Sequence, residues 1–221
     1  MGNVVAVDPQ VEGRIEVGDL RAPTDLVHFN ASAPNNSNAA PVDLTAQGTL
    51  GLRVNSGAPG LVADVRVIVL GYYVPVTASQ NALGFVPITP CALADTRHAT
   101  RWAPGRSAGQ TGIRVQISGS VGANQTNSDC GLTSPVHPDA EAAFLNVVAV
   151  TPRLDGNLKV SAAGQPAFGG AVNFGLTGGS NSNAAPFGLS TQGAIDVWTN
   201  SQPGQPATYA RIVALGYYLP F

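Results

Sequence analysis

The run Asn146-Val147-Val148-Ala149-Val150 decides the fold class of this 221-residue chain, because it also occurs earlier as Asn3-Val4-Val5-Ala6-Val7. Both runs are rich in valine, a β-branched residue that strands favour. Pro152 and Gly156 follow the later run at the same spacing as Pro9 and Gly13 follow the earlier one. Recurrence at a fixed offset is evidence of an internal repeat.

The duplication extends over most of the chain. Ser37-Asn-Ala-Ala-Pro41 returns as Ser182-Asn-Ala-Ala-Pro186, and Gly71-Tyr72-Tyr73 returns as Gly216-Tyr217-Tyr218. The offset is 143 residues between Asn3 and Asn146 and 145 for these later pairs, so one two-residue insertion or deletion suffices. The segment from about Leu83 to Leu145 has no upstream counterpart. The sequence therefore predicts a complete second unit and a first unit that is truncated at its front.

Both units alternate apolar and polar residues with a period of two, and no window has convincing helical periodicity. Turn formers such as Asp155-Gly156 separate the apolar runs. This pattern predicts an all-β fold of two tandem β-sandwich units, immunoglobulin-like or jelly-roll-like, of which the first is incomplete. The predicted boundaries are 1–76 for the truncated unit, 77–84 for a linker and 85–221 for the complete unit. The expected strands are Val4–Val7, Arg14–Val17, Leu26–Asn30, Leu50–Val54, Asp64–Tyr73, Phe85–Thr89, Ile113–Ser118, Ala142–Val150, Asn157–Val160, Ala171–Phe174, Ala194–Thr199 and Tyr209–Tyr218.

Charged residues are sparse. They make up 11% of the chain, with a formal net charge of −2, whereas an ordinary soluble domain has about 25%. Lys159 is the only lysine and the arginines are scattered, so the clustered basic surface of a nucleic-acid binder is absent. No apolar run approaches the roughly 18 residues of a transmembrane helix. We therefore expect no nucleic-acid partner and no membrane insertion.

The two cysteines, Cys91 and Cys130, allow two interpretations. Neither belongs to a C-x-x-C pair, which disfavours zinc and redox sites. Two buried free thiols are one interpretation. We favour a disulfide, which would close a loop of about 40 residues and contribute roughly 4 kcal/mol in the chain-entropy model. A disulfide implies an oxidising, extracellular setting.

The complete unit carries a recognisable set of motifs. It opens with Pro90-Cys91-Ala92-Leu93-Ala94-Asp95-Thr96-Arg97, continues with Cys130-Gly131 and Leu145-Asn146-Val147, and closes with Gly216-Tyr217-Tyr218. It resembles an all-β repeat domain of large secreted bacterial surface proteins, which begins P-C-R-x-x-D-T-R and ends G-Y-Y or G-Y-F. The resemblance covers Phe85–Tyr218, with Asn3–Tyr73 as a second copy without its front. It implies an extracellular domain with a disulfide, often arrayed, and no established catalytic role. Ala92 replaces the first arginine of the motif, and Ile68 or Val213 replaces an aspartate before the final glycine.

The densest cluster of polar, charged and aromatic side chains in the sequence begins at Asp95-Thr96-Arg97 and continues with His98, Arg101 and Trp102. One interpretation is a sugar or carboxylate pocket in which Trp102 is a stacking platform. We favour a structural one, in which Asp95 caps a turn and Arg97 binds neighbouring carbonyls or a carboxylate.

Other motifs are weaker. Gly105-Arg106-Ser107-Ala108-Gly109 matches a nucleophile elbow but lacks the strand-turn-helix context. The three histidines of the chain are His28, His98 and His137. No two of them have the spacing of zinc ligands. We expect the tyrosine pairs 72–73 and 217–218 to serve the fold, with one ring of each pair closing the core. The sequons at Asn30, Asn35 and Asn124 arise easily in an asparagine-rich chain. We expect no enzyme activity, no cofactor and no metal.

The preferred functional hypothesis is an extracellular structural protein. A sandwich without its front strands exposes unpaired edges, which a neighbouring subunit can complete by β-strand addition. The candidate assembly face consists of apolar positions near the missing strands, namely Val4, Val5, Val7, Val65, Val67 and Val69. Head-to-tail self-association through this face predicts a filament or surface layer. The alternatives are a carbohydrate-binding or adhesive module, with a glycan as its partner, and a viral or phage surface protein.

Overall fold

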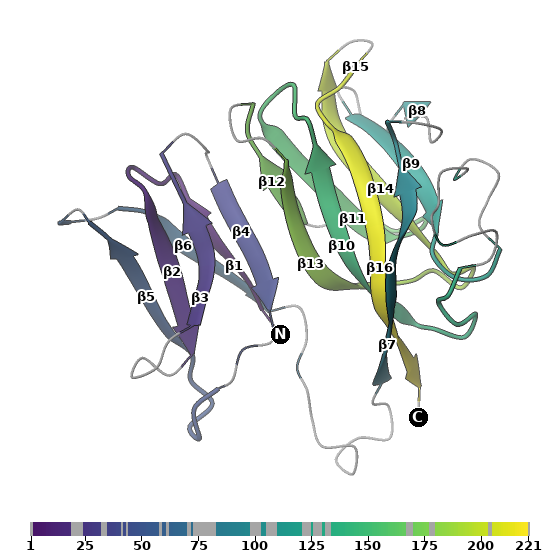
Figure 1. The fold of residues 1–221 in the computed structure, drawn as a ribbon, viewed down its shortest axis with the longest axis horizontal. Helices are drawn as coiled ribbons and strands as arrows, with labels where there is room; N and C mark the ends of the chain where they lie inside the picture. Colours follow the sequence, from purple (N-terminus) through teal and green to yellow (C-terminus); the bar gives the residue numbers. More distant parts are fainter. Residues whose placement is uncertain are drawn as a thin grey trace.

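The computed structural model describes residues 2–18, 24–31, 35–40, 42, 44–57, 59–60, 62–69, 72, 83–97, 103–104, 110–120, 125, 130, 134–166, 170–176, 180–202 and 205–220. These residues form β-strands and no α-helix, and every ladder between named strands is antiparallel (Figure 1). The predicted all-β fold in two sandwich-like units is confirmed.

The first unit consists of two three-stranded sheets. One sheet has the order β4 (Asn35–Ala40), β1 (Gly2–Val7), β6 (Asp64–Val69), and the other has the order β3 (Thr24–Phe29), β2 (Gly13–Gly18), β5 (Gly51–Ser56). Alternate residues of β1 and β2 point between the sheets, so Val4, Ala6, Ile15 and Val17 are buried there with Phe29 of β3.

The second unit repeats this arrangement and adds strands. Its first sheet has the order β13 (Asn181–Gly188), β10 (Ala142–Val150), β16 (Tyr209–Pro220), β7 (Leu83–Asp95). Its second sheet has the order β12 (Val172–Phe174), β11 (Gly156–Ala162), β14 (Ala194–Gln202), β9 (Gln110–Gln116), β8 (Ala103–Pro104), and β15 (Gln205–Pro206) pairs with β14. A larger core lies between these sheets and includes Leu93, Leu145 and Ile212.

The two units share their strand register as well as their strand order. Val4 of β1 pairs with Asn38 and Val67, and Val147 of β10 pairs with Asn183 and Ile212. These partners occupy equivalent places in the repeated sequence. The second sheets agree in the same way, because Ile15 pairs with Val27 and Val54 whereas Leu158 pairs with Val172 and Thr199. The sequence duplication is therefore a structural duplication over the described strands.

Irregular positions are duplicated too. The two described non-glycine residues with positive φ, Asp8 at 46° and Thr151 at 48°, follow β1 and β10 respectively. Gly48 and Gly193 have φ values of 73° and 70°, and each donates a backbone hydrogen bond of 2.8 Å, to the carbonyls of Thr45 and Ser190. Gly48 follows Gln47 and Gly193 follows Gln192 at equivalent places in the repeat. Both glycines are thus explained by their left-handed turn conformation.

The sequence analysis missed β4 and β13. Their Asn-Ser-Ala composition indicates a turn rather than a strand, and Pro186 also disfavours a strand assignment. Both strands lie at sheet edges, where proline is tolerated. Their asparagines link the two sheets, since Asn38 Nδ2 donates to the carbonyl of Leu26 at 3.1 Å and Asn183 Nδ2 donates to that of Ala171 at 2.7 Å.

The units meet where β4 contacts β12 and β13 (Figure 1). At this contact the backbone N–H of Ala39 donates to Asn183 Oδ1 at 2.7 Å. Ala39 and Asn183 are both buried. The edge of the first unit formed by β4 is therefore in contact with the second unit, whereas β5 and β6 form the opposite edges of their sheets.

Candidate functional site

The outstanding surface feature is the side of the first unit bounded by β5 and β6, which we call the open side. Its apolar residues Val67, Val69 and Leu52 are 38%, 76% and 36% exposed. The equivalent residues of the second unit, Ile212, Ala214 and Val197, are all 0% exposed. Positions that belong to a core in one copy of the repeat are therefore exposed to solvent in the other.

The difference arises from strands that only the second unit has among the described residues. There β7 pairs with β16 and β9 pairs with β14, whereas no described strand pairs with the outer edges of β6 and β5. Gln125 closes the gap between β7 and β9. Its Nε2 donates to the carbonyls of Leu93 and Gln116, both at 3.0 Å, and its Oε1 accepts from the N–H of Gln116 at 2.9 Å.

The structure divides the predicted assembly face into two groups. Val4 and Val5 are 0% and 6% exposed, so they need no cover from another subunit, and Val7 and Val65 are half-buried. The expectation that the run from Val4 to Val7 needs outside cover is therefore wrong: the sheet of β2, β3 and β5 covers Val4 on the inner face, and Val5 on the opposite face is already buried within the chain. Val67 and Val69 remain as the exposed part of the predicted face.

Gly216 shows what β7 contributes at this edge in the second unit. A Cβ atom at Gly216 would lie 2.4 Å from Cε2 of Phe85 and 2.8 Å from the carbonyl oxygen of Val86. The ring of Phe85 also contacts Tyr218, with ring centres 5.1 Å apart. Gly216 is therefore required by the close approach of β7. Gly71, its equivalent in the sequence, lies outside the described residues.

Asp95-Thr96-Arg97 joins β7 to β16. Thr96 donates its N–H to the carbonyl of Ala210 at 2.9 Å and accepts from the N–H of Ala210 through Oγ1 at 2.8 Å. Arg97 pairs with the buried carboxylate of Asp95, which raises the pKa of the guanidinium. These contacts fit the structural interpretation of the motif. His98, Arg101 and Trp102, which the sugar-pocket interpretation requires, lie outside the described residues.

Cys91 and Cys130 form a disulfide, as the sequence analysis favoured. The bond attaches β7 to the segment that follows β9.

Tyr217 packs partly against the core and stacks on His137, whereas Tyr218 contacts Phe85. Tyr72 is exposed. Four other predicted features lie outside the described residues: Tyr73, the serine of the elbow pattern Ser107, and the sequon positions Ser32 and Asn124.

Sequence analysis did not find the carboxylate of Glu16, whose side chain is only 4% exposed. Its oxygens accept from Arg14 Nε at 2.8 Å, Arg53 Nε at 2.6 Å and Asn55 Nδ2 at 3.2 Å. Hydrogen bonds from Arg14, then Arg53, lower the pKa of Glu16 from its ordinary 4.5 to about 2. The available signal was the Arg14-x-Glu16 spacing, which places both side chains on one face of a strand.

We expect this group to make the first unit sensitive to acid. Because the pKa of Glu16 is lower in the folded chain, its contribution to stability is complete above about pH 4.5 and is lost as the pH falls toward 2. Thermal unfolding measured across this range should show a steeper loss for the wild type than for Glu16→Gln. Parallel pH profiles for the two proteins would contradict the assignment.

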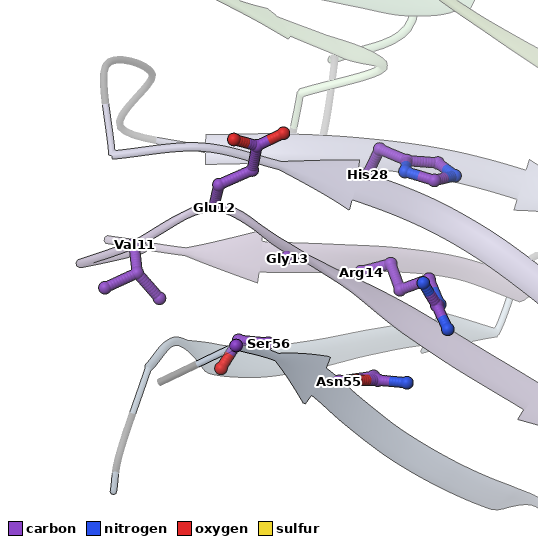
Figure 2. A pocket seen from close by; sticks show the side chains of 8 residues that line it. Val11, Glu12, Gly13, Arg14, His28, Asn55 and Ser56 are labelled. Carbon is purple, nitrogen blue, oxygen red and sulfur yellow. The ribbon is translucent and has the colours of Figure 1, made fainter. Parts of the chain in front are cut away.

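A shallow pocket of about 500 Å³ lies at one end of the sheet of β2, β3 and β5 (Figure 2). Arg14, His28 and Asn55 lie side by side across these three strands. Arg14 binds Glu16 and Asp25, and Asn55 also donates to Glu16. The polar groups of Arg14 and Asn55 are thus largely occupied by neighbouring carboxylates.

The described residues contain no cluster of three or more His, Cys, Asp or Glu side chains placed to hold a metal ion. In the same part of the chain, no helix has the length and apolarity required to cross a membrane. No protein-family model matches the chain, and no curated protein matches it.

Proposed function

We propose that this chain is an extracellular structural subunit that assembles through the open side of its first unit. Neighbouring subunits complete the incomplete sandwich by β-complementation and so build a filament or a surface layer. The disulfide between Cys91 and Cys130 supports an oxidising location.

The exposure of Val67, Val69 and Leu52 carries this proposal, because their equivalents are fully buried. Burying one such side chain contributes about 1.5–3 kcal/mol. The edge strand β6 contains neither proline nor glycine and carries two charged residues, Asp64 and Arg66. Proline and charged side chains both protect natural edge strands from pairing, so β6 lacks the first of these protections and has the second. Among the described residues, the open side thus has the apolar surface and the unpaired strand edge that an assembly contact requires.

The two ends of the molecule support a head-to-tail arrangement. The first unit ends in the open side, whereas Gln125 and the disulfide close the corresponding side of the second unit. A contact between unlike surfaces produces a filament when its rotation does not close into a ring. Self-association of this kind gives a homopolymer.

Lysine at both exposed valines should abolish assembly. Val67→Lys with Val69→Lys places two charges in the apolar contact, and negative-stain electron microscopy with light scattering should then find single particles. Leu176→Lys is the matched control, because Leu176 is 58% exposed and lies in the second unit; it should assemble as the wild type does. Equal assembly of the double variant and the wild type would reject the open side as the contact.

The pocket beside His28 is the observation that favours the alternative of a carbohydrate-binding module, because its polar row lies on an exposed sheet face. A glycan array separates the two functions. Specific glycan binding by monodisperse particles, lost in His28→Ala, would favour the carbohydrate-binding module over the structural subunit.

A further inference from the structure

We propose that the preferred occupant of the open side is a strand of a separate polypeptide with the pattern of β7, which competes with self-association and so controls assembly. The proposal rests on the proposed function in one respect, namely that the open side is completed from outside. It goes further by stating the chemistry and register of the partner.

The second unit supplies the template. In its β7–β16 ladder, Ala210 directs both its N–H and its carbonyl toward Thr96. Val65 is equivalent to Ala210, and backbone groups of alternate residues point to the same edge of a strand. The N–H and carbonyl groups of Val65, Val67 and Val69 therefore face the outer edge of β6. An antiparallel strand on this edge satisfies these groups and covers the same three side chains.

The side chains specify the partner more closely. In the template Ile212 lies opposite Ala94, and Arg211 lies opposite Asp95. The equivalents on β6 are Val67 and Arg66. A partner strand in the same register places a small apolar residue against Val67 and a carboxylate against Arg66. The β6 edge thus retains both the apolar and the basic position that face β7 in the other copy.

In the repeated sequence Gly71 corresponds to Gly216. Its counterpart Gly216 accommodates the ring of Phe85, and no positive φ requires glycine there. The first unit retains glycine at this place in the repeat, although none of its described residues supplies such a ring. A retained glycine fits a partner strand that brings an aromatic residue. The pattern predicted for the partner strand is therefore that of β7 and the residues after it: an aromatic residue and, after a spacer, Ala-Leu-Ala-Asp-Thr-Arg.

A second copy of the chain cannot supply this strand without loss. The sequence contains one segment with this pattern, Phe85–Arg97. That segment already pairs with β16, and the disulfide at Cys91 holds it in place. Each copy has two strand edges that can accept a strand of the β7 pattern, namely those of β16 and of its equivalent β6, but only one such strand, β7 itself. If copies exchanged their β7 strands, one of the two edges in each copy would still be open. Another copy can pair with or cover the open side only through a strand edge or a face that lacks this pattern, whereas a separate strand with the pattern of β7 reproduces the ladder.

A synthetic peptide with the sequence Gly84–Arg97, carrying Cys91→Ser, tests the proposal on the full chain. We expect it to bind one equivalent per chain, to slow hydrogen exchange in Asp64–Val69, and to dissolve or prevent assembly. A peptide with Phe85→Ala should bind about tenfold more weakly or worse, because the aromatic contact is lost. A scrambled peptide should not bind.

The outcomes separate this proposal from the proposed function. If the chain assembles through the open side but the peptide neither binds nor protects Asp64–Val69, the strand partner is rejected and the structural function stands. If the peptide binds there while the chain never assembles, the strand partner stands, but its control of assembly and the structural function are both rejected. If neither occurs, or if the peptide protects only other segments, both are rejected.

Discussion

Replacing Cys91 and Cys130 by serine is expected to lower the free energy of unfolding of the second unit by about 4 kcal/mol. The bond joins residues 39 apart in sequence, and removing it restores the conformational freedom of that loop in the unfolded chain. It also releases β7 from the segment after β9. Because β7 covers Ile212 and places Leu93 in the core, its release loosens the entire edge.

Tryptophan fluorescence during denaturation measures this effect, because Trp102 and Trp198 both lie in the sequence of the second unit. Reduction of the wild type should reproduce the midpoint of the double serine variant. Linked peptides containing Cys91 and Cys130 should appear in mass spectra without reduction. Equal midpoints for the oxidised wild type and the variant, or two alkylatable thiols in native material, would contradict the role of the disulfide.

Gly216→Val is expected to destabilise the second unit by about 3 kcal/mol, the upper end of the range for overpacking. The ring of Phe85, which is 45% exposed, can move away. The carbonyl of Val86, 2.8 Å from the new Cβ, belongs to the backbone of β7 and cannot move without disturbing the ladder.

Gly188→Val is the matched control for this substitution. Gly188 lies in β13 of the same sheet, and a Cβ there meets no atom within 4 Å. It should change the free energy of unfolding by no more than about 0.5 kcal/mol. If both variants unfold at the same denaturant concentration, close packing by β7 does not explain Gly216.

The all-β class and its duplication were predictable because both depend on local pattern. Valine-rich alternation in Val4–Val7 and Ala142–Val150 determines which residues face the core. The strands β4 and β13 were not predictable in this way. Asn38 and Asn183 favour turns by local propensity, but each forms a hydrogen bond to the opposite sheet that only the folded sandwich provides. Their presence in both copies was the one available signal.

The open side was predictable only in part. The missing counterpart of β7 and β9 is a fact of sequence alignment between the repeats, and it directed attention to Val67 and Val69, which are exposed. Sequence could not show that β2, β3 and β5 already cover Val4, because that depends on how the two sheets pack. The same limit applies to Glu16, since Arg53 joins it from a strand 37 residues away.

Hydrogen exchange of Asp64–Val69, compared between native assemblies and dissociated single particles, tests the central claim most directly. The equivalent segment Tyr209–Ala214 of β16 is an internal reference, because β7 protects it in every state. The account predicts that the amides of Val65, Val67 and Val69, which face the outer edge of β6, exchange fast in single particles and slowly in assemblies, with Tyr209–Ala214 slow in both. Equally fast exchange of these three amides in both states, or slow exchange already in single particles, would contradict it.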